Sequence, residues 1–179
     1  MMEPKSALRL GWKVGLFYLV FMALYALYRF FPVFPLSIFA GVTESNFQHY
    51  KATFFSFLIA GGIEYLIKHR DVTHLDLFWY PRLLAAVFSP WVVFLFWYVA
   101  PAVYGRFPSI ALEIVYANLI TLLVGVVVVS LERAFVSIQY TRLLRSLVWG
   151  LVLVSVLIYM VFTFSHLPWA DVFVEPKWH

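Results

Sequence analysis

Five long apolar stretches constrain this chain more than any other feature of its sequence. They cover residues 11–31, 47–67, 83–104, 110–131 and 143–164, and together they take up most of the 179 residues. A helix of about 20 residues crosses the ~30 Å hydrocarbon layer of a bilayer, and backbone polar groups in lipid must be satisfied within the spanning segment. We therefore expect an all-α, polytopic membrane protein, built as an antiparallel bundle of five transmembrane helices.

The composition agrees with a membrane location. Apolar residues make up 64% of the chain and charged residues only 12%, which leaves too little polar surface for a water-soluble globule. The lipid bilayer is therefore the first predicted partner. Neither a linker nor an internal repeat divides the sequence, so residues 1–179 are expected to form a single helical-bundle domain. The absence of cysteine excludes disulfides, thiolate metal sites and iron–sulfur clusters.

Basic residues near the ends of the stretches predict the orientation, because Lys and Arg prefer the cytoplasmic side of a membrane protein. Nine of the thirteen lie at the start of the first stretch, between the second and third, or between the fourth and fifth: Lys5, Arg9, Lys13, Lys68, Arg70, Arg82, Arg133, Arg142 and Arg145. We expect a multi-pass protein of the cell membrane with its N-terminus in the cytoplasm and its C-terminus outside. The basic residues form no single stripe, so no nucleic-acid partner is expected.

The connection between the first two stretches has its own signals. Pro32 and Pro35 end the first helix, and the apolar segment up to Gly41 is predicted to lie in the outer interface or to re-enter the membrane a short way. Thr43 is the predicted N-cap of the second helix, with Glu44 in its first turn.

Polar residues in and beside two of the stretches fall on one helix face each. The faces carry Ser45, His49, Thr53, Ser56, Ala60 and Glu64 on the second helix, and Glu113, Ala117, Thr121 and Gly125, with Asn118 beside them, on the fourth. Ionisable groups in hydrocarbon cost roughly 2.5–3.5 kcal/mol or more, so both faces are expected to point into the bundle. We predict a structural polar stripe, with close packing and hydrogen bonds between helices, made of Ser45, Thr53, Ser56, Glu64, Asn118 and Thr121. For Glu44, His49 and Glu113, which share one depth, a functional role stays equally open.

The second helix begins with a distinctive segment. Residues 42–51 read Val-Thr-Glu-Ser-Asn-Phe-Gln-His-Tyr-Lys. They resemble the Val-Asn-Glu-Ser-x-Trp-Glu-His-Leu-Lys signature of a family of small prokaryotic integral membrane proteins of unknown function. Near the C-terminus, residues 162–168 and 173–176 are similar to that family's Phe-Thr-x-x-Pro-Pro-His-Ile-Pro and Phe-x-Asp-Pro endings.

The resemblance spans nearly the whole chain but implies no reaction, because the family has no assigned activity. The chain also departs from the pattern, with Thr43 in place of Asn, Gln48 in place of Glu, and residues 169–171 as an insertion. Any activity that needs the family's Glu before the His is not expected with Gln48.

The predicted topology brings several ionisable residues to the outer side. Glu44, His49, Glu113 and His166 are the candidate ligand-binding residues, with Asp171 and Glu175 following in the tail. Of these, His49, His166 and Glu44 are the predicted ligands of a divalent metal such as zinc, iron or manganese. Haem b held by His49 and His166 is a minor alternative. A structural interpretation competes, in which the signature caps a helix and holds the tail against the bundle, or in which Glu44 or His49 pairs with Lys51 or Arg106.

Three functions follow from these observations. The first is a small membrane protein with an outward-facing His/carboxylate cluster that binds a ligand or metal. The second is an accessory or assembly subunit of a larger membrane complex, with other membrane subunits as partners. The third is a metal-dependent membrane hydrolase, which needs a base that Gln48 does not supply. Glu132 and Arg133 are interpreted as a local or snorkelling pair.

Overall fold

The structure, a computed structural model, describes residues 4–105, 107, 109–165 and 171–174, and within these ranges the chain is helical, without a strand. The helices are α1 (Pro4–Phe30), α2 (Phe34–Phe39), α3 (Asn46–Lys68), α4 (Leu75–Tyr104), α5 (Ile110–Phe135), α6 (Arg142–Phe164) and the short 3-10 helix η1 (Asp171–Phe173).

Four helices are long and apolar enough to cross a membrane: Leu10–Phe30 of α1, Leu75–Val99 of α4, Ile110–Phe135 of α5 and Arg142–Phe164 of α6. The prediction of an all-helical membrane protein agrees with these elements. The fifth predicted span, residues 47–67, is helix α3, which is not among the four. Its polar residues Lys51, Thr53, Ser56 and Glu64 are buried among the other helices, whereas Leu66 and Ile67 near its end are exposed.

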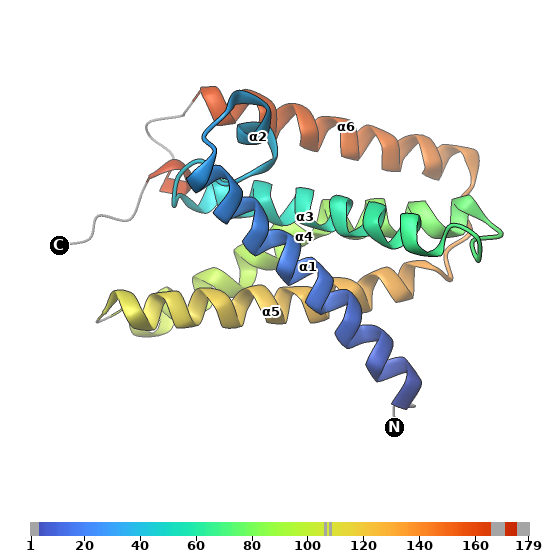
Figure 1. Cartoon of the computed structure of the whole chain (residues 1–179), viewed down its shortest axis with the longest axis horizontal. Coiled ribbons are helices and arrows are strands. Elements are labelled where there is room, and N and C mark those ends of the chain that lie inside the picture. Colours follow the sequence, from blue (N-terminus) through green and yellow to red (C-terminus); the bar gives the residue numbers. More distant parts are fainter. Residues whose placement is uncertain (1–3, 106, 108, 166–170, 175–179) are drawn as a thin grey trace.

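Figure 1 shows how α3 is enclosed. It packs along α4 and is crossed by α1, while α5 packs against α1 and α4, and α6 packs against α4. At one end of the bundle, called here the Lys13 end, α1, α4 and α6 begin and α3 and α5 finish; the opposite end is called the His49 end. The short helices α2 and η1 both lie at the His49 end.

Two helix boundaries differ from the predicted ones for a physical reason. Helix α4 begins at Leu75 rather than at residue 83, because the charge of Arg82 is neutralised by other helices and does not end the apolar helix. The predicted interfacial segment contains α2, a helix of six residues whose Pro35 occupies the first turn, where a missing N–H does no harm. Phe34 and Phe39 of α2 are exposed.

The core depends on close approach between helices. Phe17 of α1 is 1% exposed and lies against α5, where Gly125 leaves room for it. A Cβ atom at Gly125 would lie 3.0 Å from Cδ1 of Phe17 and 3.1 Å from Cγ1 of Val14. Glycine at this position therefore sets how closely α1 and α5 pack.

Helix η1 packs against α3. The ring of Phe173 lies 4.7 Å from that of Phe47 and 5.5 Å from that of Phe162, measured between centroids. The structural interpretation expected such a return of the tail to the signature, and aromatic packing supplies this contact.

Candidate functional site

Glu44 and His49, the two candidates within the signature, lie close together at the His49 end. Glu44 precedes α3, because the N-cap of that helix is Ser45 rather than the predicted Thr43. The Nε2 atom of His49 lies 3.8 Å from Oε2 of Glu44. The Glu44 side chain is 67% exposed and that of His49 is 25% exposed, so the pair borders the surface of the bundle.

The second nitrogen of the His49 ring is held by α1. Nδ1 lies 2.8 Å from the Tyr25 hydroxyl, and the two rings stack with their centroids 5.2 Å apart. Trp97 of α4 stacks at 6.2 Å from His49. Three helices therefore orient the imidazole, and Nε2 is the ring nitrogen left to meet Glu44 or a ligand.

A small cavity borders His49 on the side of the bundle interior. Its volume is about 20 Å³, which is room for a single water molecule. Asn46, Thr53, Trp97 and Thr121 contribute to its wall. The Thr53 hydroxyl is already used, since it donates to the His49 carbonyl at 2.8 Å. The cavity has room for a water molecule and is too small for an organic substrate, and Glu44 is not among the residues that line it.

The other two predicted ligands are not brought to His49 by the described residues. Glu113 lies half-buried in the first turn of α5. Within the described residues it makes no hydrogen bond or ion pair with Glu44 or His49. His166 lies outside the described residues. Over the ranges that the structure describes, no group of three or more His, Cys, Asp or Glu side chains is placed to hold a metal ion. The metal set His49, His166 and Glu44 stays a prediction, with one pair of its members in place.

Lys51 and Gln48 serve the fold around this site. The Lys51 side chain is fully buried and its ammonium donates to the Ser37 carbonyl at 2.7 Å and to the Thr163 hydroxyl at 3.0 Å. The suggested pairing of Lys51 with Glu44 or His49 is therefore wrong, because its donors are directed to α2 and α6. Gln48 is 1% exposed and accepts a hydrogen bond from the Val42 N–H.

The predicted polar stripe is buried on α3, and of its members Asn118 and Glu64 make the expected hydrogen bonds between helices. Ser45, Thr53, Ser56 and Glu64 are all buried. The hydroxyls of Thr53, Ser56 and Thr121 donate to carbonyls one turn earlier in their own helices instead of across an interface. Asn118 does bond between helices, accepting from the Tyr18 hydroxyl at 2.5 Å.

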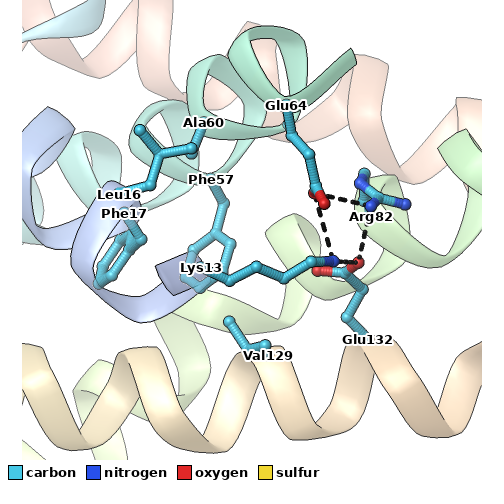
Figure 2. Close-up of a pocket in the computed structure, with 10 residues that line it drawn as sticks. Lys13, Leu16, Phe17, Phe57, Ala60, Glu64, Arg82, Val129 and Glu132 are labelled. Atoms are coloured by element: carbon cyan, nitrogen blue, oxygen red, sulfur yellow. Dashed lines mark hydrogen bonds and ion pairs between the residues drawn. The ribbon is translucent and has the colours of Figure 1, made fainter. Parts of the chain in front are cut away.

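A second polar centre, which the sequence did not predict as a site, lies at the Lys13 end. Figure 2 shows Lys13, Glu64, Arg82 and Glu132 pointing toward one another from α1, α3, α4 and α5. We call these four residues the charge cluster. Lys13 Nζ lies 2.6 Å from Glu132 and 3.3 Å from Glu64, and an Arg82 nitrogen lies 2.7 Å from Glu64 and 3.4 Å from Glu132.

The charge cluster is largely withdrawn from the surface. Its side chains are 7% to 18% exposed, and Lys68 adds a more exposed ammonium 2.8 Å from Glu64. The interpretation of Glu132 as a local pair with Arg133 missed the partners on α1 and α4. The available signal was weak: two carboxylates and two cations each stand in or beside a different apolar stretch, and such groups need partners inside the bundle.

The charge cluster surrounds a cavity of about 20 Å³, whose apolar wall includes Phe17, Phe57 and Val129 (Figure 2). Each cation contacts both carboxylates, so the cluster joins four helices at one end. Glu64 follows His49 by fifteen positions in α3, which places the two centres about 22 Å apart along the helix. All four charges are paired, so we interpret the charge cluster as a structural link between the four helices.

No protein-family model, curated protein or solved structure matches this chain. The resemblance of residues 42–51 to the membrane-protein signature stays a prediction.

Proposed function

We propose that this chain is a multi-pass protein of the cell membrane that binds a divalent metal cation through His49 and Glu44. One observation supports this proposal above the others: His49 Nε2 and Glu44 Oε2 lie 3.8 Å apart, while Nδ1 is engaged by Tyr25. Metal–ligand bonds of about 2.0–2.2 Å place donor atoms roughly 3–4 Å from one another, so the pair has the separation of two ligands of one ion.

The donor types restrict the metal. One imidazole nitrogen and one carboxylate oxygen suit zinc, iron or manganese. His166, which follows α6, is proposed as the third ligand, and water completes the coordination. The hydrolase alternative is less well supported, because it needs a base beside His49 and the residue at that position, Gln48, does not supply one. Gln48 is also buried, and its side chain accepts a hydrogen bond from the Val42 N–H.

The proposal includes a fifth membrane crossing by α3, with the N-terminus in the cytoplasm. Helix α3 has 23 residues and is therefore about 35 Å long, enough for the hydrocarbon layer. It packs along α4, one of the four apolar helices, and its polar face is covered by α1 and α4. In this orientation the His49 end faces the outside, as the distribution of Lys and Arg predicts.

The test is metal content and metal-dependent stability. Protein purified without added metal is analysed by elemental analysis, and its thermal unfolding is then measured in detergent with and without Zn²⁺ or Mn²⁺. A ligand at 100 times its Kd stabilises by about 2.7 kcal/mol, so we expect a clear rise in Tm. His49→Ala and Glu44→Gln should remove this rise.

His69→Ala is the matched control. This second histidine is exposed near the opposite end of α3, where its Nδ1 lies 2.9 Å from the Leu66 carbonyl. Its substitution should leave the effect of the metal unchanged. The proposal is wrong if the parent protein carries no metal and shows no rise in Tm, or if His49→Ala keeps the full rise.

A further inference from the structure

We infer that Tyr25, which lies on helix α1, is the positioning residue of the proposed metal site. The inference rests on the proposed function for its metal and on the structure for its geometry. The Tyr25 hydroxyl is 2.8 Å from Nδ1 of His49, a residue 24 positions away in another helix. No other described side chain bonds to that nitrogen.

The chemical reason is the single proton of a neutral imidazole. When Nε2 binds a metal, the ring proton resides on Nδ1, where it needs an acceptor. The Tyr25 oxygen lies 2.8 Å from Nδ1 and can accept that proton once Nε2 is bound to a metal, which holds the ring with Nε2 toward Glu44. Such outer-shell partners of a metal-bound histidine typically change metal affinity by 10–100-fold when they are removed.

The packing around Tyr25 shows that its ring is held from a second side. A Cβ atom built at Gly41 would overlap the ring atoms Cε1 and Cζ of Tyr25, so only glycine permits this approach. Gly41 is buried and lies immediately before the signature segment. The connection before α3 therefore lies directly against the Tyr25 ring, and the position of that ring sets the distance between its hydroxyl and Nδ1 of His49.

The first measurement is the Kd of Zn²⁺, by calorimetric titration in detergent, for the parent and for Tyr25→Phe. This variant keeps the ring and loses only the hydroxyl, and we expect binding 10–100-fold weaker. Tyr18→Phe is the matched control, because Tyr18 lies on the same helix and its hydroxyl also bonds to another helix, at Asn118. It should leave the Kd unchanged. Gly41→Ala should weaken binding as Tyr25→Phe does, because it displaces the Tyr25 ring without removing any donor.

The second measurement does not need a metal. Nitrogen-15 chemical shifts of His49, recorded on the metal-free protein, report which ring nitrogen carries the proton. We expect one fixed tautomer in the parent and in Tyr18→Phe, and a changed tautomer balance in Tyr25→Phe.

The outcomes separate the two proposals. A parent that binds no Zn²⁺ overturns the proposed function, and the chemical shifts alone then decide the role of Tyr25. A parent that binds Zn²⁺ with the same Kd as Tyr25→Phe overturns the inference and leaves the metal site standing. Identical His49 shifts in the parent and in Tyr25→Phe also overturn it.

Discussion

The Nζ atom of Lys13 lies 2.6 Å from Oε1 of Glu132, which joins the first half of α1 to the end of α5 across 119 positions of the chain. The contact belongs to the charge cluster, where every charge has at least two partners of opposite sign. A charged group in an apolar bundle is costly when it is alone and tolerated when it is paired. The charge cluster therefore specifies how four helices meet.

The first prediction concerns the loss of one partner. Glu132→Gln removes a buried charge and leaves Lys13 with its longer contact to Glu64 alone. We expect a loss of about 3 kcal/mol in the free energy of unfolding, which is the lower end for a broken buried pair because the cluster keeps some exposure. Reversible unfolding in mixed detergent measures it.

Asp76→Asn is the control for that prediction. Asp76 pairs with Arg145 at 2.6 Å, but the two side chains are 50% and 42% exposed. Exposed ion pairs contribute about 0–1 kcal/mol, so this variant should unfold nearly as the parent does. Equal losses for Glu132→Gln and Asp76→Asn would contradict a special role for the charge cluster.

The second prediction removes both partners at once. In the double variant Lys13→Met and Glu132→Met, no uncompensated charge of this pair remains, and two apolar side chains of similar length occupy the site. Replacing a buried ion pair by apolar residues is often neutral or stabilising. We expect the double variant to be more stable than either single variant, as measured in the same unfolding experiment. A double variant whose loss equals the sum of the single losses would mean that the two charges act independently.

The third prediction tests the close contact between α1 and α5. A methyl group at Gly125 would meet Phe17 and Val14 at 3.0–3.1 Å, so Gly125→Ala forces these side chains to move. Overpacking of this kind costs about 1–3 kcal/mol. Gly150→Ala is the control on α6, where a Cβ atom meets nothing within 4 Å. Thermal unfolding should show a lower Tm for the first variant and an unchanged or slightly higher Tm for the second.

The helices were predictable because a bilayer imposes a length and a composition on each span. The long helices α5 and α6 begin within one residue of the predicted starts at 110 and 143. The start of α4 was missed because the charged Arg82 was interpreted as the boundary of the apolar stretch 83–104. Its charge is neutralised by Glu64 and Glu132, and a pattern along one segment does not reveal partners on others.

The candidate site was predictable only in part. The predicted topology brings Glu44 and His49 to one side of the membrane, but a spacing of five on a helix would set them about 140° apart. They meet because Glu44 lies before the N-cap Ser45 and is not part of α3. Tyr25 was not singled out, because an aromatic residue in a predicted span is commonly part of the apolar packing. Its contact with His49 depends on how α1 crosses α3 and on the space that Gly41 leaves, which are both properties of the packed bundle.

The fourth prediction concerns Lys51, which links α3 to α2 and α6. Lys51→Met keeps the length of the side chain and loses the bonds to the Ser37 carbonyl and the Thr163 hydroxyl. Lost hydrogen bonds from a buried charged donor cost about 1–3 kcal/mol, and the loss should be local to α2. We expect faster amide hydrogen exchange over residues 34–39, while Lys68→Met, at the other end of α3, should leave that exchange unchanged. Unaltered exchange in Lys51→Met would show that α2 is held by its apolar contacts alone.

The last prediction tests the proposed orientation and the crossing by α3 together. The chain has no cysteine, so single cysteines can be introduced without background. Ser165→Cys lies just after α6 at the His49 end and is exposed, and Val72→Cys lies between α3 and α4 at the Lys13 end. With the N-terminus in the cytoplasm, a membrane-impermeant thiol reagent added to intact cells should label Ser165→Cys, and Val72→Cys should react only after the membrane is opened. Thr43→Cys, in the connection before α3, tests the crossing. If α3 crosses, the reagent should label Thr43→Cys but not Val72→Cys on intact cells. If α3 does not cross, both positions lie on one side of the membrane and should react alike. Labelling of Val72→Cys on intact cells, or protection of Ser165→Cys, would contradict the orientation, because Lys and Arg near the Lys13 end would then face outward against their preference.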